Sequence, residues 1–148
     1  MNKIHSITDR TPEVSQQLVC IWEGAVRATH FFLTEQNITE LRPLVQQGIE
    51  HIPHLLVYRN QEHALGFMGI QDAKLEMLFV DPAVRGQGIG KQLVTHAIHT
   101  LDVRYVDVNE QNPEAAGFYE HLGFQVYDRS ESDEQGQPFP ILHMKLFT

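Results

Sequence analysis

The chain has 148 residues, of which 42% are hydrophobic, and a formal net charge of −8 from 11 Lys and Arg against 19 Asp and Glu. This length suits one domain, residues 1–148, and the acidic balance argues against a nucleic-acid-binding protein, which needs a basic face. There is one cysteine, no apolar run long enough for a bilayer and no hydrophobic region of a signal peptide, so we expect a cytoplasmic protein without disulfide or membrane attachment.

The first third of the chain predicts two helices. Thr11-Pro12-Glu13 combines a capping hydroxyl, a proline at the first helical position and an early acid, and apolar residues then recur at helical spacing to about His30. Cys20 lies on this helix and is expected in the core. Thr34 can cap a second helix with the apolar stripe Ile38, Leu41, Val45 and Ile49, in which Pro43 predicts a kink or two short pieces.

Strands dominate the middle of the chain. Residues 54–60 and 63–70 flank the turn Asn60-Gln61-Glu62 and are typical of a hairpin. Residues 74–81 form a third predicted strand, which Asp81-Pro82 ends, and a glycine-rich loop then leads into an amphipathic helix.

The last third predicts a strand, a helix and a second hairpin. Residues 103–109 are strand-like, Asn112-Pro113-Glu114 repeats the helix-start signal, and Gly123 ends that helix with a left-handed cap. Residues 124–130 and 141–147 form the final strands. This order predicts an α/β (α+β) domain with a mixed, mostly antiparallel central sheet and helices on both faces.

The glycine loop, Arg85 to Lys91, lies between a strand and a helix N-terminus, where free backbone N–H groups and the helix dipole favour an anion. Glycines allow the backbone to approach that anion closely. The loop is not a Walker A motif, because Arg85 replaces its first glycine and Gln92 its hydroxyl residue. It is not a dinucleotide fingerprint either, because Lys91 replaces the last glycine. The alternative is a tight turn that binds nothing.

The segment Arg85-Gly86-Gln87-Gly88-Ile89-Gly90 matches the pattern [RQ]-x-x-G-x-[GA] and thereby resembles the GCN5-related N-acetyltransferase (GNAT) superfamily. "LFVDP" before it and "NPEAAGFYEHLGF" after it also resemble this family, and the element order agrees over nearly the whole chain. "WEGAVRATHFFL", "VNEQNPEAAGFYEHLGF" and "RSESDEQGQPFPILHM" are similar to a bacterial subgroup of small, YjaB-like acetyltransferases.

This resemblance implies an acyl-CoA N-acyltransferase fold and acetyl-coenzyme A (acetyl-CoA) as the cosubstrate, with no metal. The pyrophosphate would lie on the loop, and the pantetheine arm would lie between two splayed strands, those ending at Asp81 and Asn109. A β-bulge near Met77 or Leu78 would free the strand edge that pairs with pantetheine. The cofactor-binding residues implied in this way are Leu78, Phe79, Val80, Arg85, Gly86, Gln87, Gly88, Ile89, Gly90, Lys91, Asn109, Asn112, Phe118 and Tyr119.

Tyr119 is the candidate general acid, because the family places a tyrosine in this helix and "GFYEHLGF" brings Tyr119 to that position. A phenol with its ordinary pKa of about 10 stays protonated at neutral pH and can donate to a leaving thiolate. The alternative is a tyrosine that only packs in the core. Asn112 can serve as a helix cap and nothing more, whereas Asn109 ends a strand at the expected channel.

Two residues are candidates for the general base. Glu76 lies on the strand before the loop, where several family members carry a glutamate; the alternative is an exposed strand acid. His30 follows the first helix in the region that forms the acceptor side in the family, and an imidazole with an ordinary pKa of about 6.5 suits proton removal. Its alternative is a helix cap or a core group. Arg27 could hold a substrate carboxylate or form a surface ion pair.

We therefore predict an enzyme that transfers an acetyl group from acetyl-CoA directly to an amine in a ternary complex. The acceptor could be a small molecule or a protein amine, and Asp128, Glu131, Asp133 and Glu134 could attract it or merely be solvated. The alternative is a non-catalytic sensor of acetyl-CoA. Exposed strand edges would permit a homodimer.

Overall fold

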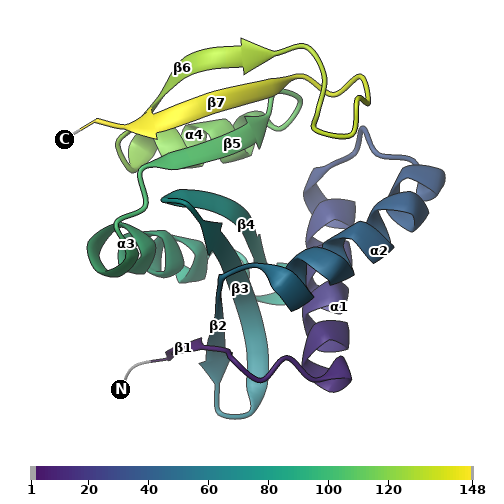
Figure 1. Ribbon diagram of the computed structural model, residues 1–148, viewed down its shortest axis with the longest axis vertical. Helices are drawn as coiled ribbons and strands as arrows, with labels where there is room; N and C mark the ends of the chain where they lie inside the picture. The colour runs from purple at the N-terminus through teal and green to yellow at the C-terminus, as the bar shows by residue number, and fades with distance from the viewer. Residues whose placement is uncertain (1–2, 148) are drawn as a thin grey trace.

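The computed structural model describes residues 3–147, which form a seven-stranded sheet with helices on both faces (Figure 1). In chain order the elements are β1 (Ile4–Ser6), α1 (Pro12–Thr29), α2 (Glu35–His51), β2 (His54–Asn60), β3 (His63–Gln71), β4 (Lys74–Val80), the 3₁₀ helix η1 (Pro82–Val84), α3 (Ile89–Leu101), β5 (Tyr105–Asn109), α4 (Pro113–His121), β6 (Phe124–Ser130) and β7 (Ile141–Leu146). No helix within residues 3–147 combines the length and the apolar character that crossing a bilayer requires.

The strand order is β1-β2-β3-β4-β5-β7-β6, so that β1 and β6 are the two edges. Neighbouring strands are antiparallel except for the parallel pair β4 and β5. The predicted mixed, mostly antiparallel sheet is therefore confirmed.

The two helical layers follow from alternation along the strands. Leu55, Val57 and Phe67 pack against α1 and α2, whereas Leu56 and Met68 face the other side, where α3 and α4 pack. Figure 1 shows α1 and α2 on one side of β2, β3 and β4 and α3 on the opposite side. In the same view, α1 and α2 do not extend over β5, β7 and β6.

The parallel strands β4 and β5 diverge soon after they meet. Within the described residues, they pair only at Lys74 with Tyr105 and Leu75 with Val106, while β3 continues to pair with β4 as far as Val80. The backbone edge of residues 77–80 that faces β5 is consequently left without a strand partner. This divergence is the splay that the sequence predicts.

A β-bulge starts the divergence. The register of β3 and β4 shifts between the pairs Gly69–Met77 and Ile70–Leu75, so Glu76 is the extra residue. The bulge was expected near Met77 or Leu78, and it lies directly before Met77, so this prediction is confirmed. Met77 itself packs close to Gly69 of β3, where an added Cβ would lie 2.7 Å from its Cε atom.

Two expectations need correction, and one short strand was missed. Helix α2 is a single element across Pro43, so the expected alternative of two short pieces is wrong and the alternative of a kink stays a prediction; its capping box at Thr34 is complete. Cys20 is exposed, because it lies on the outer face of α1, although buried Leu18 and Trp22 are only two positions away in the chain. The short strand β1 was not predicted, since three residues give too little alternation to detect.

Replacing Pro43 by Ala should raise the free energy of unfolding by about 2 kcal/mol, because an exposed interior proline costs a helix a hydrogen bond and a steric clash. Urea denaturation measures the change. Pro12→Ala is the matched control, since Pro12 occupies the first turn of α1, where its missing N–H has no helical partner to lose. Equal effects at both positions would contradict this account of α2.

Candidate active site

Two adjoining cavities follow the splay. One, of about 260 Å³, runs between β4 and β5 from the end of α1 to α4, and the other, of about 410 Å³, lies at the glycine loop. They share the wall residues Leu78, Val80, Arg85, Ala115 and Tyr119. A long ligand anchored at the loop can therefore extend through the splay toward α1.

The glycine loop ends in a helix N-terminus that lacks a side-chain cap among the described residues. Gly88 is the N-cap of α3 with φ of +80°, and Gly86 has φ of +82°, conformations that favour glycine. The first helical hydrogen bond runs from Gln92 N–H to the Gly88 carbonyl, at 3.0 Å. The N–H groups of residues 86–91 precede this bond and are available to an anion, which the helix dipole also favours, whereas Arg85 N–H already donates to the Pro82 carbonyl at 3.3 Å.

Gly90 differs from the other two glycines of the loop. Its φ is not positive, and an added Cβ would make only an ordinary contact with Phe118, at 3.5 Å. Gly90 and Phe118 both line the loop cavity. Neither the backbone conformation nor the packing therefore requires a glycine at position 90. Because Gly90 has no side chain, this part of the loop cavity stays open.

The charged residues of the loop lie at its rim. Arg85 Nη2 pairs with Glu114 Oε2 of α4 at 3.0 Å, with side chains 48% and 74% exposed, so the pair contributes little to stability. Lys91 lines the loop cavity, whereas Gln87 is exposed and the Ile89 side chain is buried in the core. Of these residues, Arg85 alone borders both cavities.

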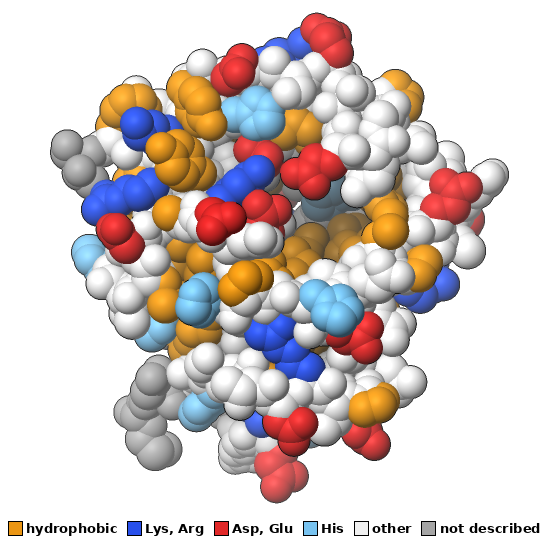
Figure 2. Space-filling model, viewed as in Figure 1, with side chains coloured by type: hydrophobic (Ala, Val, Ile, Leu, Met, Phe, Trp, Pro, Cys, Tyr) orange, Lys and Arg blue, Asp and Glu red, His pale blue; other side chains and the backbone are white. Residues whose placement is uncertain are grey.

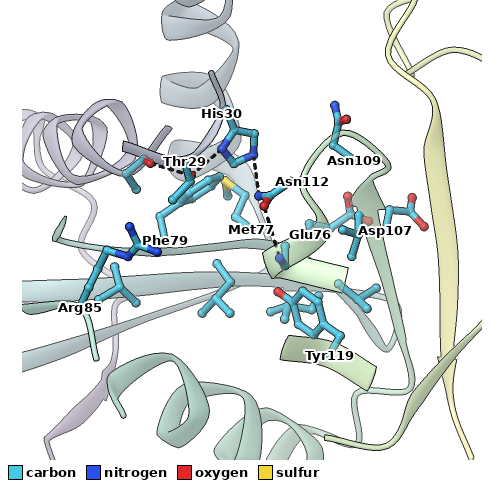
Figure 3. Close-up of a pocket in the computed structure, with 17 residues that line it drawn as sticks. Thr29, His30, Glu76, Met77, Phe79, Arg85, Asp107, Asn109, Asn112 and Tyr119 are labelled. Carbon is cyan, nitrogen blue, oxygen red and sulfur yellow. Dashed lines mark hydrogen bonds between the residues drawn. The ribbon is translucent and has the colours of Figure 1, made fainter. Parts of the chain in front are cut away.

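Tyr119 lies where the two cavities meet. Its side chain is only 7% exposed and packs edge-on against Phe118 and Phe124, with ring centroids 5.0 and 5.7 Å away. Burial raises the pKa of the phenol, which therefore stays protonated. Figure 3 shows its hydroxyl directed into the pocket rather than toward the core.

Glu76 reaches the same pocket from the bulge in β4. Its side chain is 31% exposed and lies 3.6 Å from Lys74 Nζ. Burial raises the pKa of this carboxyl, and the charge of Lys74 opposes that shift. Because the bulge breaks the alternation of β4, Glu76 and Met77 both lie on the side of α1 and α2.

The sequence did not single out Asp107, which also lines the pocket. Its carboxylate accepts from Lys74 Nζ at 2.5 Å and from His143 Nδ1 at 2.7 Å, and the His143 Nε2 atom lies 2.6 Å from Ser130 Oγ. The available signal was the alternation of polar side chains at Tyr105, Asp107 and Asn109. Figure 2 shows the hollow on this face, with acidic and basic side chains around an apolar floor.

His30 ends α1 and borders the pocket opposite Tyr119. Its Nδ1 atom lies 2.8 Å from Thr29 Oγ1, and its Nε2 atom lies 3.4 Å from Asn112 Nδ2 (Figure 3). Burial lowers the pKa of the imidazole below its ordinary value of 6.5. His30 is therefore neutral at pH 7.

The two asparagines have different surroundings. Asn109 Oδ1 accepts from Gln111 N–H at 2.9 Å, and Figure 3 shows the side chain pointing away from Tyr119. Asn112 is 7% exposed, caps α4 through Ala115 N–H, and contacts His30. The sequence anticipated the cap but not the contact with His30, which joins residues 82 positions apart.

The remaining candidates divide between pocket and surface. Asp133 and Glu134 border a small cavity next to Glu76 and Asp107, whereas Glu131 pairs with Arg129. Arg27 is held by Glu23 and Glu35, so its surroundings are those of a surface ion pair.

The pocket unites an uncapped helix N-terminus, a free strand edge, a protonated phenol, a carboxyl group and an imidazole, which together suit acyl transfer from a phosphate-bearing carrier. The family model for the acetyltransferase (GNAT) domain matches residues 23–146. The chain belongs to the GNAT family, and it is an enzyme that transfers an acetyl group to an amine.

Relatives support the same assignment. The chain is 42% identical over 132 residues to the peptidyl-lysine N-acetyltransferase YjaB of Salmonella typhimurium, covering 89% of this chain and 91% of that protein. The solution structure of apo YjaB from Escherichia coli is 40% identical, with a TM-score of 0.86 over 96% of this chain and 95% of that one. At 20% identity, a Thermoplasma acidophilum N-acetyltransferase solved with coenzyme A shares the fold, with a TM-score of 0.68 over 96% of this chain and 98% of that one.

Proposed function

We propose that the protein transfers the acetyl group of acetyl-CoA to the ε-amine of a lysine side chain in a protein or peptide, by direct attack in a ternary complex. The observation that carries this proposal is the continuous passage from the uncapped N-terminus of α3, through the splay, to Tyr119, Glu76 and His30. The name of the YjaB relatives supports lysine as the acceptor.

The cofactor would be held mainly by backbone. The pyrophosphate would accept hydrogen bonds from the backbone N–H groups of residues 86–91, with Arg85 contributing its side chain, and the amides of pantetheine would pair with the free edge of Leu78 to Val80. Asn109, Asn112 and Phe118 line the same passage. This arrangement leaves the thioester between β4 and β5, where a backbone N–H of β4 can polarise its carbonyl.

The chemistry would need one acid and one base. The neutral amine attacks the thioester carbon, a C–N bond forms and the C–S bond breaks. His30 Nε2 takes the proton of the amine, and Tyr119 gives its proton to the departing thiolate. Glu76, beside Asp107, would attract the acceptor's ammonium group before it loses its proton. Association of two copies through a sheet edge remains a prediction.

Tyr119→Phe should retain affinity for acetyl-CoA and lower kcat by about 100-fold, since one positioned proton donor contributes roughly that factor. A thiol-release assay with a lysine-containing peptide measures kcat, and calorimetry measures affinity for acetyl-CoA. Unchanged kcat would remove Tyr119 from the proposed mechanism. Absence of thiol release by the wild-type enzyme with every lysine peptide would contradict the proposed acceptor.

Gly90→Ala should weaken coenzyme A binding about tenfold, because a methyl group would enter the loop cavity and overpacking costs on the order of 1–3 kcal/mol. Calorimetric Kd values test this. Gly117→Ala is the matched control, since it also adds a methyl group to a helix but meets nothing within 4 Å. Equal Kd values for both variants would argue against pyrophosphate binding at the loop.

Lys74→Met should lower KM for a lysine peptide about fivefold. In the wild type, Lys74 pairs with Glu76 and Asp107, so its charge competes with the ammonium group of the acceptor. An ion pair of this exposure contributes about 1 kcal/mol, which corresponds to that factor. Steady-state kinetics with varied peptide measure this change, and KM for acetyl-CoA should stay constant. Lys145→Met is the control: Lys145 lines the same open face but lies over the Tyr105 ring. An equal gain there would show a general charge effect instead.

A further inference from the structure

Hydrogen bonds link the backbone of α1 to that of α4 through His30, and each has a defined direction. Thr29 Oγ1 donates its only proton to the Ala25 carbonyl at 2.8 Å. It must therefore accept at its contact with His30 Nδ1, also 2.8 Å long, so Nδ1 carries the imidazole proton.

The other end of the chain fixes the second ring nitrogen. Asn112 Oδ1 accepts from Ala115 N–H at 3.3 Å as the cap of α4, which turns the amide nitrogen toward His30 Nε2, 3.4 Å away. An amide nitrogen only donates, so Nε2 must present its lone pair. Rotating the amide by 180° would remove the helix cap, and the cap therefore locks this orientation.

The same geometry opposes protonation of His30. An imidazolium would direct an Nε2–H group at the donor hydrogens of Asn112, while the oxygen of that amide, which could accept from it, is held by the cap of α4. The charged or titratable side chains that share the pocket are Glu76 of β4, Arg85, Asp107 of β5 and Tyr119 of α4. Burial, rather than any of these groups, is the cause of the lowered His30 pKa.

We propose that Asn112 is a positioning residue for His30: its amide, oriented by the α4 cap, donates to Nε2 and keeps the imidazole neutral in the Nδ1–H tautomer, with the Nε2 lone pair unprotonated until the acceptor displaces this 3.4 Å contact. The inference rests on the proposed role of His30 as proton acceptor. It gives Asn112 a function in addition to the cap and to any contact with the cofactor. It also couples the α4 end of the splay to the acceptor end formed by α1.

Asn112→Asp and Asn112→Ser test the proposal, because both retain an oxygen that can cap α4. The aspartate replaces the donor by a carboxylate oxygen, which an imidazolium can bind, so the pKa of His30 should rise by about 1–3 units. In Asn112→Ser the side chain is too short to reach His30. This variant therefore shows the effect of losing the contact without introducing a negative charge. Nitrogen-15 NMR of the full chain, with the His30 signals identified by their loss in His30→Gln, measures pKa and tautomer.

The wild type should show the Nδ1–H tautomer, and Thr29→Val should shift the population toward Nε2–H. A His30 pKa unchanged in Asn112→Asp, or a wild-type Nε2–H tautomer, would overturn the proposal. In kinetics, neutral His30 is the active form, so activity is lost as pH falls through its pKa and the acidic limb of kcat/KM should move upward in Asn112→Asp. The lysine amine of the acceptor also titrates, equally for both enzymes. Dividing the pH profile of kcat/KM for Asn112→Asp by that of the wild type therefore removes its contribution.

The two readouts separate the hydrogen-bond chain from the proposed function. NMR reports on the imidazole without any acetyl transfer, so failure to acetylate lysine peptides leaves its result interpretable. A raised His30 pKa without a matching movement of the pH profile would overturn His30 as the proton acceptor, while the tautomer assignment stands.

Discussion

The loss of strand pairing between β4 and β5 after Leu75 and Val106 is the constraint on which the site depends. A parallel pair this short leaves the edge of residues 77–80 without a strand partner in the described chain, and exposed strand edges are natural partners for amide groups. The bulge at Glu76 lies where this separation begins, and Met77, the next residue, lines the pocket and packs close to Gly69 of β3.

The other functional groups are placed relative to that opening by helix ends. The N-terminus of α3 lies at one end of the splay, with its backbone N–H groups uncapped by side chains within residues 3–147. The C-terminus of α1 supplies His30, and the N-terminus of α4 supplies Asn112 and, two turns later, Tyr119. Because each group sits on a rigid element, the pocket can hold a thioester, an acid and a base together without a large rearrangement.

Local signals in the sequence predicted most of the fold. Thr11, Thr34 and Asn112 cap the helices that they were expected to cap, and Asp81-Pro82 ends β4. His30, Glu76 and Tyr119 do line one pocket, although their chemical roles stay predictions. The contacts of Asn112 with His30 and of Asp107 with His143 were out of reach, since they join distant segments whose register only the folded sheet defines. Cys20 was misplaced because its apolar character suggested the core, whereas the spacing from buried Leu18 and Trp22 puts it on the opposite face of α1.

A crystal structure with bound coenzyme A tests the central claim most directly. The account predicts pyrophosphate oxygens about 2.7–3.2 Å from backbone N–H groups of residues 86–91, and a sulfur atom within hydrogen-bond reach of Tyr119 Oη. It further predicts pantetheine amides paired with the edge of Leu78 to Val80. A pyrophosphate bound away from the loop, or a sulfur beyond reach of Tyr119 with the splay empty, would contradict it.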